Sequence, residues 1–380
     1  MTVGIGRLQL HRPGAASQWV FWGYLLVVSV AEVLSAVVHP QLGLIAHAIT
    51  LIGLLVHAGI GRYDETRKLA LALILAPMIR LLSFSLPLLR FPQAAWYPIV
   101  SIPLLLATWL IIRHIKVAGY TLGLTRNNLV LQLLLVPGGL GLGVIEYLIL
   151  RPAPFANSFS WGSFWLLALS LTIFTGFTEE LIFRGLLQNL SVPVLGRWGL
   201  VYVALLFAVL HAGYQSVLDV VFVFAVGLVF GYIVSWGGSI LGVTLAHGLT
   251  NITLFLVMPF LAMHPDHPGT LMLPWLVTAG TLLAMVAFAI LVLRSVWGIR
   301  IRVARQNPAT TIRATRRAAG LTYTDLACRS GISVRELAVM EHGLEPLPVE
   351  QLARISRKIT NVLPLPAVGM SELSRDKDDV

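Results

Sequence analysis

The sequence predicts an all-α protein, a polytopic transmembrane helical bundle of about ten spans joined to a small cytoplasmic all-α domain. Hydrophobic residues make up 57% of the 380 residues and charged residues only 12%, and the mean hydropathy is +0.83. Such values lie far outside the range of soluble globular proteins. Apolar runs long enough to cross a bilayer as a helix recur along the chain. They occupy 18–38, 41–60, 69–89, 95–112, 128–150, 160–178, 199–213, 217–236, 239–260 and 271–293.

Basic residues predict that both termini are cytoplasmic. The first apolar run is long and follows Arg7 and Arg12, so we expect a retained anchor rather than a cleaved signal peptide. With this end inside, the outer loops receive mainly Arg90 and Arg151. The inner loops receive Arg62, Arg67, Lys68, Arg113, Lys116, Arg126, Arg197 and Arg294.

The net charge indicates which partners the chain could bind, and the cysteine content limits disulfide and thiol chemistry. The charge of +10 lies mostly in inner loops and in 294–317, which suits anionic lipid first and nucleic acid second. Cys328 is the single cysteine, so an intramolecular disulfide is excluded. Because Cys328 lies in the tail, a thiol nucleophile within the membrane is a poor hypothesis.

Composition predicts the domain organisation. After Leu293 the apolar pattern gives way to an arginine-rich stretch without acidic residues, which marks a membrane boundary, and a helical pattern punctuated by glycine follows. We expect N-terminal transmembrane helices at 1–127, a membrane core at 128–294, a basic linker at 295–307, a helical domain at 308–363 and a disordered tail at 364–380.

Three polar stretches interrupt three different apolar helices. They are EELIFR (Glu179, Glu180, Arg184), FAVLH (Phe207, His211) and HGLTN (His247, Asn251). Each stretch contains an i,i+4 pair, which places two of its side chains on one helix face. A charged side chain in the middle of a membrane helix costs roughly 2.5–3.5 kcal/mol, so the bilayer alone does not explain them. A Glu180–Arg184 pair would leave Glu179, about 100° around the helix, available as a general base.

A structural role is the alternative for these residues. An ion pair could fix a helix end, and the histidines could be hydrogen-bonded within the bundle. We expect such interior roles for Glu32, His47, His57 and Arg80, which are isolated polar residues in the earlier spans. The carboxylate, imidazole and amide groups on the three later helices instead favour a site, because no comparable set occurs elsewhere in the sequence.

The order EExxxR, FxxxH, HxxxN resembles the CPBP family, the CAAX-protease and bacteriocin-processing (Abi) group that includes the type II CAAX prenyl endopeptidases. The resemblance covers about 160–260, or loosely 128–294. It implies an intramembrane endopeptidase in which Glu179 and His211 activate a water molecule. Glu180 and Arg184 would support the site, and His247 with Asn251 would stabilise the oxyanion. Water must reach this point, so we expect the bundle to open to the cytoplasm.

Metal dependence is a separate question. Glu179, His211 and His247 could ligate Zn²⁺ and leave one position open. The sequence contains no HExxH motif, and the resemblance favours a glutamate-dependent scheme. We therefore expect no cofactor, with zinc as the alternative.

The stretch IRATRRAAGLTYTDLACRSGISVRELAVMEHGLEPLPVEQLARISRKI resembles a Cro/CI-type (XRE) helix-turn-helix domain. Thr322 is the expected N-cap of one helix, and Gly331 is expected in the turn after that helix. The resemblance implies that Ser333 and Arg335 face a major groove. The residues expected to meet phosphates are Arg316, Arg317 and Arg329. DNA contact, protein docking and a purely structural tail all remain open.

Together these patterns predict an endopeptidase of the bacterial cytoplasmic (inner) membrane, with both termini inside. Its partners would be the lipid bilayer, a membrane-associated protein or peptide substrate and, through the tail, DNA or a cytoplasmic protein. One alternative is a non-proteolytic bacteriocin-immunity or scaffold protein. Another is a membrane-tethered transcription regulator for which the bundle is only a sensor.

Overall fold

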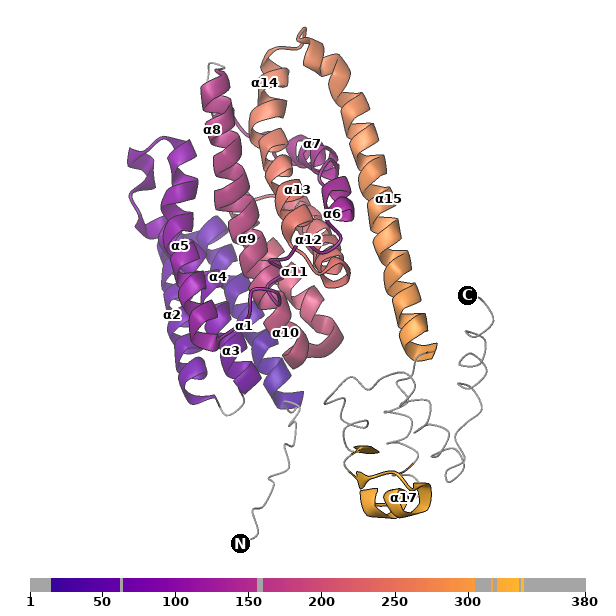
Figure 1. Cartoon of the computed structure of the whole chain (residues 1–380). Helices are drawn as coiled ribbons and strands as arrows, with labels where there is room; N and C mark the ends of the chain where they lie inside the picture. Colours follow the sequence, from indigo (N-terminus) through magenta and orange to yellow (C-terminus); the bar gives the residue numbers. More distant parts are fainter. Residues whose placement is uncertain are drawn as a thin grey trace, which may run out of the picture. The chain divides into compact units, whose positions relative to one another are not determined.

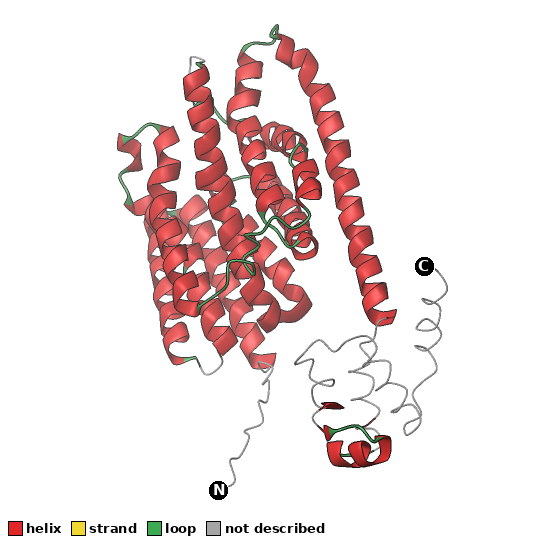
Figure 2. Cartoon of the chain, viewed as in Figure 1, coloured by secondary structure: helices red, strands yellow, loops and turns green. Residues whose placement is uncertain are grey.

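The computed structural model describes residues 15–61, 64–155, 160–304, 316, 320–334 and 336–337. Every regular element in these residues is a helix, and none of them forms a strand (Figures 1 and 2). The chain divides into two compact units, Met1–Leu291 and Val292–Val380. The predicted all-helical fold is therefore confirmed. The break at 291 lies close to the predicted membrane boundary after Leu293, while the finer domain limits stay a prediction.

In the described part of the chain, nine helices are long and apolar enough to cross a membrane. They are Gln18–Val38, Pro40–Ile60, Asp64–Ser85, Ala94–Ile115, Leu129–Leu150, Trp161–Tyr214, Val217–Gly237, Leu241–Met263 and Pro268–Ser295. The sequence predicted about ten because Trp161–Tyr214 contains two of the predicted runs. The chain turns within that segment at Gly196, whose φ of 60° is a left-handed conformation that favours glycine.

The N-terminal helices form one side of the first unit. They are α1 (Ala15–Val33) with η1 (Leu34–Val38), α2 (Pro40–Ile60), α3 (Asp64–Leu73), α4 (Leu75–Ser85), η2 (Leu88–Arg90) and α5 (Gln93–Ile115). Pro40 occupies the first turn of α2, where its missing N–H costs no helical hydrogen bond. α1 packs against α11 and α3 against α10, so the N-terminal helices are continuous with the core.

The remaining helices of this unit carry the three polar stretches. They are α6 (Leu129–Leu135), α7 (Gly138–Leu150), α8 (Trp161–Leu171), η3 (Thr172–Phe177), α9 (Thr178–Glu180), η4 (Leu181–Leu187), α10 (Gln188–Leu195), η5 (Gly196–Trp198), α11 (Gly199–Val209), η6 (Ala212–Tyr214), α12 (Val217–Gly237), α13 (Leu241–Ile252), η7 (Thr253–Val257), α14 (Met258–Met263) and α15 (Pro268–Ala304). The segments from α8 to α10 follow one another as one long helix (Figure 1). α13 packs against α7, η3 and α8, so it lies inside the bundle.

Glycine allows α7 and α13 to approach closely. A Cβ atom on Gly139 would lie 2.3 Å from the carbonyl oxygen of Ala246, and one on Gly143 would lie 2.5 Å from that of Thr250. Real Cβ atoms do not approach a backbone carbonyl so closely, so only glycine fits at this spacing. Small residues at helix contacts are the usual means by which membrane helices pack, since lipid provides no hydrophobic driving force between them.

We expect Gly139→Ala to lower the thermal unfolding midpoint of the detergent-solubilised protein. The added methyl group must push α7 away from α13, and overpacking of this kind costs about 1–3 kcal/mol. Gly53→Ala in α2 is the matched control, because a Cβ there meets nothing within 4 Å. Equal midpoints for the two variants would show that α7 and α13 are not held at this distance.

Candidate functional site

The two adjacent glutamates lie where the helix is wound more loosely. Glu179 and Glu180 belong to α9, and π-helical turns precede and follow it in η3 and η4. Such turns insert an extra residue into a helix and are frequent at functional sites. Arg184 lies in η4, and its side chain still reaches back to Glu180.

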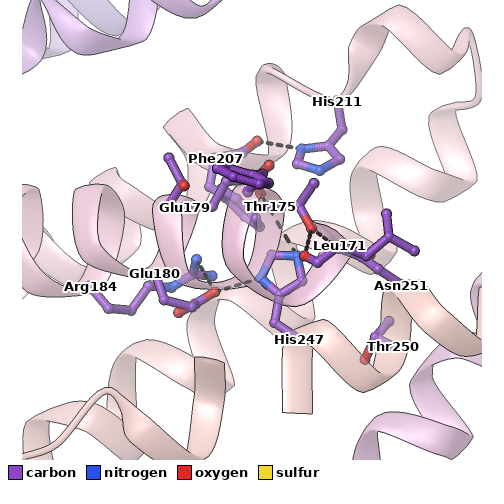
Figure 3. A network of polar contacts seen from close by, with 12 residues as sticks. Leu171, Thr175, Glu179, Glu180, Arg184, Phe207, His211, His247, Thr250 and Asn251 are labelled. Atoms are coloured by element: carbon purple, nitrogen blue, oxygen red, sulfur yellow. Dashed lines mark hydrogen bonds and ion pairs between the residues drawn. The ribbon is translucent and has the colours of Figure 1, made fainter. Parts of the chain in front are cut away.

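Glu180 joins the arginine to one of the histidines. Its Oε1 accepts a hydrogen bond of 2.9 Å from Arg184 Nη1 and one of 2.8 Å from His247 Nδ1 (Figure 3). The side chains of Glu180 and Arg184 are 0% and 1% exposed. A buried charge of either sign needs such a partner, because neither lipid nor apolar side chains can solvate it.

The bond to Glu180 also orients His247. Since Nδ1 donates to the carboxylate, the opposite ring nitrogen Nε2 is directed away from Glu180 and lies 3.8 Å from Glu179 Oε2. That distance is too long for a hydrogen bond. Among the described residues, Glu179 Oε2 has no hydrogen-bond partner, although its side chain is 28% exposed overall. Glu179 therefore remains available for a ligand or a water molecule.

Phe207 packs among the ionisable groups. The guanidinium carbon of Arg184 lies 4.2 Å from its ring centroid, a cation–π contact that offsets part of the desolvation of the arginine. His211 packs edge-on against the same ring and hydrogen-bonds to the carbonyl oxygen of Phe207 through Nδ1, at 2.9 Å. A carbonyl can only accept, so Nδ1 carries the proton and Nε2 of the neutral ring is an acceptor.

Asn251 is fixed by a residue that the sequence motifs did not reveal. Its Nδ2 donates a 2.7 Å hydrogen bond to Thr175 Oγ1, and the Thr175 hydroxyl donates to the carbonyl oxygen of Leu171 (Figure 3). Thr175 precedes Glu179 by four residues. The i,i+4 rule that selected the other pairs could have identified it.

All predicted catalytic residues line one cavity of about 90 Å³. They are Glu179, Glu180, Arg184, His211, His247 and Asn251. The wall also contains polar residues that the sequence analysis did not assign, namely Tyr97, Glu146, Thr175, Tyr214 and Thr250. Tyr97 and Glu146 come from α5 and α7, and no spacing pattern connects these helices with the motifs.

Among the described residues, no group of three or more His, Cys, Asp or Glu side chains is placed to hold a metal ion. Glu179, His211 and His247 line one cavity without forming such a group. His211 Nδ1 is bonded to a backbone carbonyl and His247 Nδ1 to a carboxylate, so Nε2 is the nitrogen left for a ligand on each ring. Zinc therefore stays the alternative to the metal-free scheme.

The polar residues of the N-terminal helices hold the backbone next to His211. Arg80 Nε donates to both carboxylate oxygens of Glu32, at 2.7 and 2.9 Å, and His47 Nε2 lies 3.3 Å from the same carboxylate. Arg80 Nη2 donates to the carbonyl oxygen of Leu210, the residue before His211. These residues were expected to serve interior packing. The contact with Leu210 means that this packing also holds the backbone next to His211.

A second hydrogen bond ties the same turn to η1. Gln215 Nε2 donates to the carbonyl oxygen of Ala36 at 2.6 Å. The turn at 210–215 is thus held at both ends by the N-terminal helices. The position of His211 therefore depends on residues outside its motif as well as on Phe207 within it.

The described part of the second unit contains α17 (Tyr323–Ser330). Thr322 caps this helix reciprocally with Asp325, and Gly331 ends it with a φ of 62°, so the predicted cap and turn are confirmed. The hydrogen bonds from the Thr322 hydroxyl and backbone N–H lower the pKa of Asp325. Ser333 and Glu336 make a second reciprocal pair, in which each backbone N–H donates to the other side chain.

The residues expected to contact DNA differ in their placement. Arg316 is buried, donates to the carbonyl oxygen of Leu321 and lies over the Tyr323 ring, so its expected contact with phosphate is not supported. The Ser333 side chain is engaged with Glu336, which leaves it poorly placed to read bases. Arg329 is exposed. Arg317 and Arg335 lie outside the described residues, as does everything after 337.

Residues 161–253 match the family described as type II CAAX prenyl endopeptidase Rce1-like. This segment contains all three polar stretches and supports a multi-pass membrane protein with a CAAX-type intramembrane protease core. It does not extend to the tail, so the helix-turn-helix resemblance stays a prediction. No curated protein and no solved structure gives a significant match to the chain.

We expect Arg80→Leu to destabilise the bundle by about 3–5 kcal/mol, because it leaves the buried Glu32 carboxylate without its partner. The double variant Glu32→Leu/Arg80→Leu should recover much of this loss, since two apolar side chains bury no charge. Thermal unfolding in detergent measures both.

The control for Arg80→Leu is Lys68→Ala, which removes an exposed ion pair with Asp64. Exposed pairs contribute less than about 1 kcal/mol. If Arg80→Leu and Lys68→Ala shift the unfolding midpoint equally, the Glu32–Arg80 contact is not a buried pair in the protein.

Proposed function

We propose that the chain is an intramembrane endopeptidase that hydrolyses a peptide bond of a membrane-associated protein or peptide. In this proposal Glu179 and His211 activate the attacking water molecule. The observation that carries the proposal is the convergence of Glu179, His211 and His247 on one cavity within a segment that matches an endopeptidase family.

The cavity suits a reaction with water. A water molecule needs about 10–15 Å³ of such space, so a volume of about 90 Å³ holds several. Glu179 Oε2 has no hydrogen-bond partner in the described part of the chain and can accept a proton. His211 Nε2 is the acceptor of its ring and can hold the same water in place.

The fixed groups would stabilise the charge that develops during attack. As the water oxygen bonds to the carbonyl carbon, Glu179 takes its proton and the carbonyl oxygen becomes an oxyanion. Asn251 uses one amide N–H for Thr175 and retains a second for this oxyanion. A His247 ring protonated at both nitrogens would supply another donor through Nε2. The tetrahedral intermediate then collapses by breaking the C–N bond, and Glu179 returns the proton to the leaving amine.

Glu180 and Arg184 act by positioning. Glu180 Oε1 holds the His247 ring by Nδ1, and Arg184 balances the charge of that carboxylate. Arg184 Nη2 approaches Gly227, where a Cβ atom would lie only 3.2 Å away. The absence of a side chain at Gly227 therefore leaves room for the guanidinium.

A large apolar cavity beside the site supports a membrane-associated substrate. It has a volume of about 430 Å³, and its walls include Phe155, Phe164 and Phe260. Phe255 lines this cavity and the catalytic cavity as well, and it stacks on Phe155 at 5.2 Å. Apolar residues flanking the cleaved bond could therefore be buried next to the catalytic groups.

We expect Glu179→Gln to reduce cleavage by about 10²–10⁴-fold, because the amide keeps the shape of the side chain and cannot accept the proton from water. Membrane proteomics that compares wild type with Glu179→Gln should reveal uncut precursors. Glu65→Gln, an exposed position of α3, is the matched control. Cleavage that persists in Glu179→Gln removes the catalytic assignment.

The same assay separates the metal-free scheme from the zinc alternative. Chelation of divalent metal should leave the cleavage rate unchanged if Glu179 and His211 act directly on water. A rate lost on chelation and restored by zinc alone would replace this scheme.

For the tail we propose a helix-turn-helix docking module that contacts DNA. The proposal is supported by the capped helix α17, by the turn at Gly331 that ends it, and by the reciprocal hydrogen bonds between Ser333 and Glu336. Leu326, Ile332 and Leu337 are buried and provide a small core. Protein docking is the alternative partner class, and a non-proteolytic scaffold or regulator would use the same surface.

We expect the full-length protein in detergent to bind duplex DNA with an affinity that falls as salt rises. Arg329→Ala should reduce the slope of log K against log salt by about 0.9 if Arg329 neutralises one phosphate. Cys328→Ser is the matched control, because it changes the neighbouring exposed residue without changing charge. Absent or salt-insensitive binding would favour docking to a protein.

A further inference from the structure

The connections between the helices of the first unit lie on two opposite faces. One set comprises the loop at 116–128, η5 and the turn at 238–240. Thr125 Oγ1 donates to the carbonyl oxygen of Gly238 at 2.7 Å, and the backbone N–H of Ile240 donates to Gly123 at 3.0 Å. Asn189 in α10 also donates to the backbone of this loop, at Thr121. We call this the basic face, defined by Arg113, Lys116, Arg126 and Arg197.

The other set of connections meets at the opposite ends of the same helices. It comprises the turn at 210–216, the start of α5 and the end of α7. This turn is bonded to η1, which ends α1, through Gln215 and Ala36. Tyr97 and Phe155 lie 6.0 Å apart between ring centroids, which joins the start of α5 to the segment after α7. We call this the tyrosine face, defined by Tyr97 and Tyr214.

Exposure differs between the side chains at the two ends of the catalytic cavity, although Glu146, Thr250 and Asn251 in its wall are buried. Tyr214 is 49% exposed, while the side chains of Glu179 and His247 are 28% and 13% exposed. Arg184 and Glu180, further along, are 1% and 0% exposed. The cavity therefore opens beside Tyr214 and closes beyond Arg184.

Residues from the basic face seal the closed end. Leu122, from the loop at 116–128, is buried in the same apolar cluster as Ile182 and Leu186. A Cβ atom on Gly185 would lie 3.0 Å from the carbonyl oxygen of Leu122, so this loop packs directly on η4. The helix after Glu180 is thereby covered on its basic-face side.

The open end is lined with polar groups close to the tyrosine face. Tyr97 lies four residues after the start of α5, and Glu146 lies four residues before the end of α7. At about 1.5 Å of rise per residue, each residue is therefore about 6 Å along the helix axis from that helix end. Glu146 lines the cavity and is itself buried, with 8% of its surface exposed. A carboxyl group facing lipid would be costly, so water is the expected neighbour of this end.

We infer that the catalytic cavity opens on the tyrosine face, and that the substrate is therefore a protein segment presented on the non-cytoplasmic side of the membrane. Basic residues concentrate on cytoplasmic loops, and the tyrosine face has only Arg90 and Arg151 beside its connections. This inference rests on the proposed endopeptidase function and replaces the expected opening to the cytoplasm. A cytoplasmic protein tail would approach the sealed end.

Cysteine labelling tests this inference, because Cys328 is the single cysteine and Cys328→Ser gives a cysteine-free protein. Tyr214→Cys and Arg197→Cys report the tyrosine and basic faces, and Glu146→Cys reports the cavity. Each is treated with a membrane-impermeant, charged thiol reagent in sealed right-side-out and inside-out vesicles.

We expect Tyr214→Cys and Glu146→Cys to react in right-side-out vesicles and Arg197→Cys only in inside-out vesicles. Thr250→Cys, a change to a small side chain in the cavity wall, replaces Glu146→Cys if that variant does not accumulate. Reaction of the cavity cysteine only from the Arg197 side, or from neither side, overturns the inference. Reaction of Tyr214→Cys and Arg197→Cys from one side overturns the two-face arrangement itself.

The labelling result is independent of catalysis. Cavity labelling from the tyrosine face together with full cleavage by Glu179→Gln would sink the proposed function and leave the opening intact. Cleavage lost in Glu179→Gln together with labelling from the basic face would support the proposed function and overturn the inferred opening.

Discussion

The site depends on the cost of burying charge inside a membrane protein. Glu180 and Arg184 are almost inaccessible, and each would be strongly unfavourable without the other. Glu180 Oε1 accepts from both Arg184 and His247, so the requirement for pairing also fixes the orientation of an imidazole. Glu179 is left outside this arrangement, with an oxygen to which no described residue donates a hydrogen bond. Neutralisation of one carboxylate is what makes its neighbour chemically available.

The same constraint recurs in the N-terminal helices. Glu32 is buried and requires Arg80, and the part of the guanidinium not used by Glu32 reaches the carbonyl oxygen of Leu210. A charge pair formed for its own stability thus fixes the turn that precedes His211. The N-terminal helices lie outside the segment that matches the endopeptidase family, yet they hold one of its expected catalytic residues.

Sequence patterns predicted the features that arise from periodicity and missed those that depend on the backbone. Apolar runs revealed the spans, and i,i+4 spacing placed Glu180 beside Arg184. The π-helical turns around α9 leave no pattern in composition, and a second acceptor of Arg80, besides Glu32, is a carbonyl 130 residues away. Every residue carries a backbone carbonyl, so a sequence motif cannot indicate which one accepts a hydrogen bond. Glu146 was hidden for another reason, because it stands alone in a helix with no polar partner at four residues.

A cavity closed at one end constrains the form of the substrate as well as its side of approach. In the proposed reaction, water, the scissile carbonyl and both products would pass the inferred opening, because Leu122 packs against η4 at the other end. An α-helix is about 10–12 Å across with its side chains, and its carbonyls are already hydrogen-bonded. A cavity of about 90 Å³ favours a short extended segment over a helix. If the proposed endopeptidase acts on a transmembrane substrate, we therefore expect that substrate to unwind near the tyrosine face before its peptide bond reaches Glu179.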